Sequence, residues 1–142
     1  MFSVINMNML IFVIGLSGSG KSTYSRHICE QYNIKYISLD ELSKNDIDIV
    51  EYVIDCNSIC LIDGLQSIDL FFYSKTYREL IYKSIVIIMN TNYFKCLYNG
   101  YKRDKHKCNK GYIYLFRHYM LNNFKLLVRL LFIKIVFWSF NC

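Results

Sequence analysis

Short apolar runs alternate with stretches of mixed polarity along most of the chain. Four of the runs are continuous and end at polar residues or glycine, which is the pattern of buried strands in a parallel sheet. They cover Met9–Ile14, Ile34–Ser38, Ser58–Asp63 and Ser84–Met89.

The stretches between the runs repeat their apolar residues at the spacing of one helical face. The helices predicted from this spacing cover residues 21–32, 46–55, 74–83 and the residues that follow Thr91. Ser74 and Thr91 carry side chains that can cap the last two of these helices. A strand followed by a helix, repeated in this way, predicts parallel βαβ units and an α/β fold.

The pattern changes after residue 101. Residues 102–112 predict a polar, basic loop, residues 113–132 a broadly apolar helix, and residues 133–138, "IKIVFW", a fifth strand. The tail over residues 124–142 carries three positive charges and no acid. A membrane span, an interfacial helix and a truncated or frame-shifted end remain as alternatives for it. No stretch rich in Gly, Pro or Ser divides the chain, so residues 1–142 predict one domain.

Charge divides the chain unevenly. Residues 1–101 carry 8 Lys and Arg against 10 Asp and Glu, whereas residues 102–142 carry 9 against 1. A basic half indicates an anionic partner: nucleotide phosphate, nucleic acid or lipid. The six cysteines have no regular spacing, which favours reduced thiols in a cytoplasmic protein over a disulfide framework. We expect no metal role for His106 and Cys108, because no second ligand pair follows them.

The segment "GLSGSGKST" satisfies the pattern G-x-x-x-x-G-K-[ST] and lies between a predicted strand and a predicted helix. Glycines let the backbone turn its N–H groups toward phosphate, and the helix adds its positive end. Lys21 can reach the β and γ phosphates, and the Ser22 hydroxyl can bind Mg²⁺. The residues predicted to bind the nucleotide are Gly15, Ser17, Gly18, Ser19, Gly20, Lys21, Ser22 and Thr23.

Two acids follow predicted strands at the edge of the sheet where ligands bind. Asp63 ends the run "CLID" and can hold Mg²⁺ opposite Ser22, although a turn-forming Asp-Gly pair is the alternative. Asp40 follows "YIS" and can take the proton of an attacking hydroxyl. Asp40 could instead bind the acceptor or cap the next helix.

The segments "GLSGSGKST", "YISLDEL", "CLIDG" and "YFKCLYNGYKRD" together resemble the P-loop nucleoside and nucleotide kinases, which include adenylate, shikimate and uridine kinase-like enzymes. The resemblance covers about residues 9–112. It implies a three-layer fold with strand order 2-3-1-4-5, and ATP with Mg²⁺ as cofactors. On the family pattern, Lys21 and Ser22 hold phosphate and metal, Asp63 supports the metal, and Asp40 meets the acceptor.

The family also implies a mobile lid that carries arginine, and residues 102–112 stand where that lid would be. Arg103 is the candidate to neutralise charge on the transferring phosphoryl group. Members of the group usually carry two or more arginines there, whereas this segment has one among lysines. A solvated basic loop is therefore the alternative.

These observations favour an ATP-dependent kinase that transfers phosphate to a small molecule or nucleotide. We expect neither a nucleic acid nor a membrane as its partner. Two other functions stay open: a nucleotide-binding module that has lost catalysis, and a nucleic-acid-associated ATPase. The sequence gives little support for a GTPase, because "LIDGL" lacks the D-x-x-G spacing and no N-K-x-D follows an apolar strand.

Overall fold

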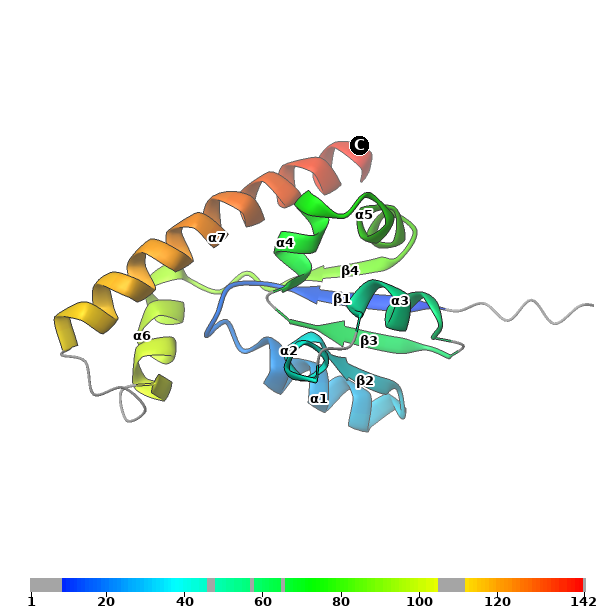
Figure 1. Ribbon diagram of the computed structural model, residues 1–142, viewed down its shortest axis with the longest axis horizontal. Coiled ribbons are helices and arrows are strands. Elements are labelled where there is room, and N and C mark those ends of the chain that lie inside the picture. Colours follow the sequence, from blue (N-terminus) through cyan, green and yellow to red (C-terminus); the bar gives the residue numbers. More distant parts are fainter. Residues whose placement is uncertain (1–8, 46–47, 57, 65, 105–111, 142) are drawn as a thin grey trace, which may run out of the picture. The chain divides into compact units, whose positions relative to one another are not determined.

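The computed structural model describes residues 9–45, 48–56, 58–64, 66–104 and 112–141. Its strands and helices follow one another along the chain (Figure 1), and the four predicted strands and the helices predicted at 21–32, 46–55, 74–83 and after Thr91 are present, whereas the helices at 39–44 and 66–73 were not predicted. In chain order they are β1 (Leu10–Ile14), α1 (Lys21–Tyr32), β2 (Lys35–Ser38), α2 (Leu39–Lys44), α3 (Ile49–Ile54), β3 (Cys60–Asp63), α4 (Gln66–Tyr73), α5 (Lys75–Tyr82), β4 (Ile85–Ile88), α6 (Tyr93–Asp104) and α7 (Tyr112–Asn141).

The described residues form a four-stranded sheet in the order β2-β3-β1-β4. Strand β3 pairs in parallel with both β1 and β2, and the register sets Asp63 beside Val13 on one side and Ser38 on the other. The predicted α/β fold and the order of its first four strands are therefore confirmed. Because parallel strands end at the same edge, the polar ends of β2 and β3 meet there.

Apolar side chains of β1 and β3 fill the centre of this sheet. Phe12, Val13, Leu61 and Ile62 are completely buried, as expected for strands that are covered on both faces. Helix α1 packs against β1, β2 and β3, and helix α4 packs against β1. This packing fixes the carboxyl ends of β1 and β3 relative to the start of α1.

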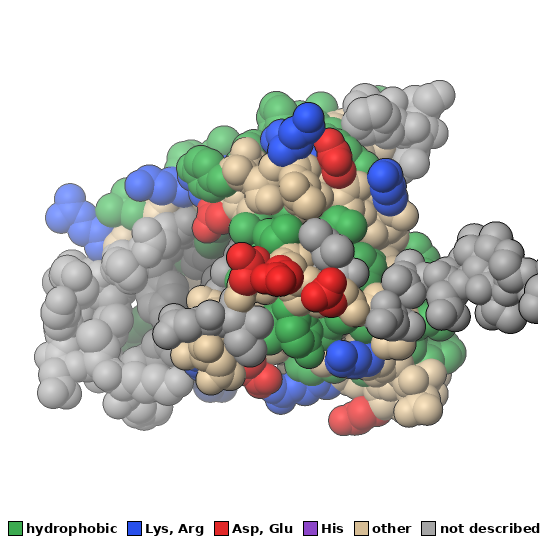
Figure 2. Space-filling view, turned by 45° about the vertical axis from the view of Figure 1, so that its right-hand side comes forward, with side chains coloured by type: hydrophobic (Ala, Val, Ile, Leu, Met, Phe, Trp, Pro, Cys, Tyr) green, Lys and Arg blue, Asp and Glu red, His purple; other side chains and the backbone are tan. Residues whose placement is uncertain are grey.

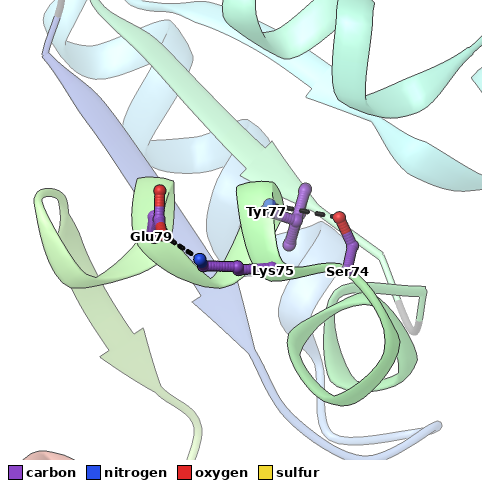
Figure 3. A network of polar contacts seen from close by, with 4 residues as sticks. All are labelled: Ser74, Lys75, Tyr77 and Glu79. Atoms are coloured by element: carbon purple, nitrogen blue, oxygen red, sulfur yellow. Dashed lines mark hydrogen bonds and ion pairs between the residues drawn. The ribbon is translucent and has the colours of Figure 1, made fainter.

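Helix α5 begins where the sequence predicts. The Ser74 hydroxyl accepts a hydrogen bond from the Tyr77 N–H at 3.2 Å, and an exposed ion pair joins Lys75 to Glu79 at 4.0 Å (Figure 3). The Tyr77 side chain is fully buried, and its ring meets Phe12 edge to face with centroids 5.5 Å apart. The cap therefore sets a helix whose buried face contacts the central strand.

The predicted fifth strand is wrong. Residues 133–138 lie inside α7, a helix of 30 residues. No Gly or Pro interrupts the sequence from Tyr112 to Asn141, so nothing ends a helix that has begun there. The β-branched and aromatic residues of "IKIVFW" favour a strand only weakly, and this preference is overridden. None of the helices in the described ranges is long and apolar enough to cross a membrane.

The chain divides into two compact units. The first comprises Met1–Ile14 and Lys21–Ile87, and the second comprises Gly15–Gly20 and Ile88–Cys142. The first unit contains most of the sheet and helices α1 to α5. The second unit thus contains the loop after β1 together with helices α6 and α7. These two helices pack against each other.

Candidate nucleotide-binding site

The loop between β1 and α1 turns at two glycines with positive φ, 76° at Gly18 and 87° at Gly20. Its turn is closed by a hydrogen bond from the Ser19 N–H to the Leu16 carbonyl at 3.1 Å. A Cβ on Gly18 would collide with the backbone carbonyl of Cys96 in α6, whereas a Cβ on Gly20 would meet nothing within 4 Å. Gly18 thus permits close contact with α6, and Gly20 borders open space of the kind a ligand needs.

Side chains in and just before α6 hold the carbonyl groups of this loop. The Thr91 hydroxyl donates to the Ser19 carbonyl at 2.9 Å, and the Asn99 amide donates to the Gly18 carbonyl at 3.0 Å. Because a trans peptide directs its C=O and N–H to opposite sides, the Gly20 N–H points away from Thr91. The contacts of Thr91 and Asn99 therefore turn the N–H side of the loop toward a potential anion.

Thr91 does not cap α6 as predicted. The Asn92 carboxamide oxygen accepts hydrogen bonds from the N–H groups of Phe94 and Lys95 at 2.9 and 3.3 Å, so Asn92 is the cap. The cap prediction was off by one residue because Thr and Asn are both good caps and adjacent in sequence. The hydroxyl of Thr91 holds the phosphate-binding loop instead.

Lys21, Ser22 and Thr23 form the first turn of α1 in the first unit. Lys21 is buried, whereas Ser22 and Thr23 are exposed. The first turn contains no acidic residue, so no side-chain carboxylate competes for its free N–H groups. The positive end of α1 is thereby suited to bind an anion.

Asp63 lies at the carboxyl end of β3 and is only 2% exposed. Its Oδ2 accepts a hydrogen bond from the Tyr36 hydroxyl at 3.0 Å. Among the described residues, its Oδ1 has no hydrogen-bond partner. A buried carboxylate oxygen without a donor is costly, by about 1–3 kcal/mol. The Oδ1 atom of Asp63 is therefore suited to bind a group that is not part of the chain.

The Tyr36 hydroxyl belongs to a small polar cluster at this end of the sheet. Burial raises its pKa, and the charge of Asp63 and the hydrogen bond to Asp63 raise it further. The neighbouring hydroxyls of Ser22 and Ser38 act in the opposite direction on the same pKa. Tyr36 thus connects the start of α1 to the ends of β2 and β3.

The oxygen atoms of this cluster match the ligands that Mg²⁺ prefers. In proteins Mg²⁺ is commonly held by one or two carboxylates, water and the phosphates of the substrate. Asp63 offers a carboxylate, and Ser22 offers an exposed hydroxyl in the same unit. No group of three or more His, Cys, Asp or Glu is placed to bind a metal in the described part of the chain. This set fits a metal that arrives with the nucleotide.

Asp40 lies in the first turn of α2 and is exposed. The predicted alternative that Asp40 caps this helix is wrong, because the Ser38 hydroxyl accepts the Glu41 N–H at 3.4 Å. Ser38 precedes the helix directly and takes the cap position. The carboxylate of Asp40 is left at the surface, two residues beyond the end of β2.

The basic loop predicted over residues 102–112 starts later than expected. Lys102 and Arg103 lie in the last turn of α6, and residues 105–111, with His106 and Cys108, fall outside the described residues. The first three residues extend the amphipathic helix, which continues through Gly100 to Asp104. Arg103 donates from Nη2 to the Ser17 hydroxyl at 3.4 Å. Arg103 therefore contacts the phosphate-binding loop itself.

A hollow of about 550 Å³ lies near Lys35, at the end of β2 opposite to Ser38. Three acids, Asp48, Glu51 and Asp55, line it together with Lys35. Figure 2 shows acidic side chains gathered on one face of the molecule. Such a lining repels phosphate, so this hollow is not the nucleotide site.

The sequence analysis missed four residues that contact the loop or Asp63. They are Tyr36, Thr91 in this role, Asn99 and Gly100. For Tyr36 the sequence indicates only that it shares a face of β2 with Ser38, two residues later, and this spacing does not identify Asp63 as its partner. The others depend on the approach of α6 to residues more than 70 positions earlier in the sequence.

Comparisons with known proteins match the part of the chain that contains the loop. A family described as an AAA domain matches residues 10–51. Over 42 residues, 30% of this chain, the sequence is 52% identical to the adenylate kinase of Thermococcus gammatolerans, and the match covers 18% of that protein. It is 50% identical over 42 residues to the adenylate kinase of Thermococcus sibiricus. The family match, over residues 10–51, contains the loop, α1, β2 and α2.

The fold comparison extends further along the chain. The structure of a shikimate kinase from Acinetobacter baumannii, in complex with shikimate, is similar with a TM-score of 0.57 and 17% identity. The similarity covers 88% of this chain and 81% of that one. At this identity the likeness concerns the fold alone. The predicted resemblance to the P-loop nucleoside and nucleotide kinases is thus confirmed: the fold is similar to that of a shikimate kinase, and residues 10–51 match the family model.

Proposed function

We propose that the protein is a kinase that transfers the γ-phosphoryl group of Mg·ATP to a hydroxyl or phosphate of a small acceptor. The observation that carries the proposal is Asp63, a buried carboxylate with an unpartnered Oδ1 at the end of the strand next to the P-loop. A glycine-rich turn with a structural role alone needs no such acid.

The P-loop residues have distinct roles in this proposal. Residues 15–20 offer backbone N–H groups to the phosphates, and Lys21 neutralises charge on the β and γ phosphates. Ser22, with Asp63, holds Mg²⁺, which supplies charge neutralisation between these phosphates. Thr23, the third residue of α1, belongs to the same N-terminal turn and completes the set of residues that bind the nucleotide.

Asp40 and Arg103 act on the acceptor side and the transfer itself. The Asp40 carboxylate takes the proton from an acceptor hydroxyl as its oxygen bonds to the γ-phosphorus. The bond from this phosphorus to the bridging oxygen breaks, and ADP leaves. Arg103 neutralises charge on the group in transfer. The proposal places the activity in the cytoplasm, which the free thiols of Cys29, Cys56 and Cys60 support.

Calorimetric titration of Mg·ATP into wild-type protein and Lys21→Met tests the proposal. We expect the variant to lose at least ten-fold in affinity, because Met keeps the length of the buried side chain without its charge. Thermal unfolding of both proteins serves as the control for folding. Equal affinity in two folded proteins would refute the phosphate role of the loop.

The same samples then identify the acceptor. ADP release is measured with a panel that begins with adenylate and shikimate, the compounds named in the relatives. Release that depends on one compound names the acceptor. Tight binding of ATP without release for any compound favours the second function, a nucleotide-binding module without catalysis. The single arginine among the lysines of residues 102–112 and the unusual tail over residues 124–142 motivate that alternative.

A further inference from the structure

The Tyr36 hydroxyl and the Asp63 carboxylate form the one polar pair that joins the ends of β2 and β3 in the described structure through side chains. Register places Ser38, two residues after Tyr36, directly beside Asp63. Tyr36 and Ser38 lie on the same face of β2, and the Tyr36 side chain extends from that face to Asp63. A half-buried tyrosine hydroxyl usually finds a hydrogen-bond partner, and here that partner is an acid with a candidate metal role.

The hydrogen bond divides the two oxygens of Asp63 between different tasks. Oδ2 accepts from Tyr36, and Oδ1 stays buried without a donor. An ionised carboxylate has about four acceptor positions, so one phenol cannot satisfy it. The tyrosine orients the carboxyl plane and leaves Oδ1 for a cation or a water bound to one.

Two further contacts hold the tyrosine in place. The guanidinium carbon of Arg26, on α1, lies 5.8 Å from the centroid of the Tyr36 ring. Strand β2 itself is paired with β3 along its length. A ring restrained by α1 and by the sheet presents its hydroxyl to Asp63 in a fixed direction.

From this geometry we propose that Tyr36 is a positioning residue for the metal: it orients Asp63 so that Mg²⁺ binds with the nucleotide. The proposal rests on the metal and nucleotide site proposed above. Partners of metal ligands commonly contribute 10–100-fold to metal affinity. Loss of the Tyr36 hydroxyl should therefore weaken Mg²⁺ binding but not the binding of metal-free nucleotide.

The test measures the affinity of a fluorescent ATP analogue while Mg²⁺ is titrated, and again in EDTA. In Tyr36→Phe we expect unchanged affinity in EDTA and a rise of about ten-fold in the Mg²⁺ concentration that gives half of the effect. Tyr52→Phe is the matched control, because Tyr52 is also half-buried in the first unit but lies under Lys35, 5.4 Å from the ring centroid to Nζ.

A double-variant cycle separates positioning from a general structural effect. Because Tyr36 acts through Asp63, Tyr36→Phe should add nothing in the background of Asp63→Asn. An unchanged Mg²⁺ midpoint in Tyr36→Phe would overturn the inference. A loss of affinity for the ATP analogue in EDTA that equals the loss with Mg²⁺ would also overturn it, since that result indicates damage to the fold.

The outcomes distinguish this inference from the proposed function. Wild-type protein that shows the Mg²⁺ effect but transfers no phosphate would contradict the kinase and leave the role of Tyr36 intact. Wild-type protein that binds no nucleotide would contradict both. A normal kinase with no shift in Tyr36→Phe would contradict the role of Tyr36 alone.

Discussion

At the scale of single residues, the phosphate-binding loop depends on two glycines in different surroundings. Gly18 and Gly20 both have positive φ, which costs about 1–2 kcal/mol with a side chain. At Gly18 a Cβ also meets the backbone of α6, whereas at Gly20 it meets nothing. We therefore predict that Gly18→Ala lowers the free energy of unfolding by roughly 3 kcal/mol, and Gly20→Ala by roughly 1–2 kcal/mol.

Urea denaturation of the two variants measures this difference, and Mg·ATP affinity gives a second readout. Gly20→Ala should lose more affinity than its small loss of stability implies, because the added methyl enters the open space beside the loop. A Gly18→Ala protein as stable as wild type would show that α6 does not approach Gly18 as closely as described.

The sequence predicted the phosphate loop and Asp63 at this scale because their chemistry is local. Lys21 and Ser22 follow the glycines directly, and Asp63 ends an apolar run. The role of Tyr36 could not be predicted with them. Its partner lies 27 residues away, and a tyrosine in a strand usually serves packing. Strand register was needed to bring the two side chains together.

At the scale of elements, helix α6 and the residues before it act as a support for the loop. The Thr91 hydroxyl contributes one hydrogen bond, to the Ser19 carbonyl. Thr91→Val keeps the shape and removes this donor, so we predict a loss of about 1 kcal/mol in stability and a several-fold loss in Mg·ATP affinity. Thr76→Val, an exposed position of α5, is the control. Thermal unfolding and calorimetry compare the variants.

A result in which Thr91→Val and Thr76→Val behave alike would contradict the support role. Loss of stability with full ATP affinity would restrict Thr91 to a packing role. Only loss of affinity beyond the change in folding supports the view that this hydrogen bond orients the loop.

Prediction of elements from the sequence succeeded where breakers and caps bound them. The four strands were found because each is a short apolar run, and α5 because Ser74 caps it. Helix α7 was cut short by the predicted fifth strand, since "IKIVFW" alone fits a strand as well as a helix. The choice depends on the continuous helix before it, and a local pattern does not contain that information.

At the scale of the whole molecule, charge is the feature that separates the remaining functions. The formal net charge is +6, the sum of +8 over residues 102–142 and −2 over residues 1–101. A positive protein attracts any polyanion at low salt, including nucleic acid that is not its ligand. Weak binding of DNA or RNA would therefore not by itself make this protein a nucleic-acid enzyme.

The dependence of affinity on salt distinguishes nonspecific binding of nucleic acid from the binding of Mg·ATP. We predict that affinity for a DNA or RNA oligonucleotide falls by at least 10³-fold between about 50 and about 200 mM salt, whereas Mg·ATP affinity changes only a few-fold. The reason is that, in the proposed site, ATP binds to buried and backbone groups around Lys21 and Gly20, which salt screens little. Fluorescence titration at both salt concentrations measures the two affinities. ATP hydrolysis stimulated by nucleic acid at the higher salt would contradict the kinase proposal, because it requires a specific contact that screening does not remove.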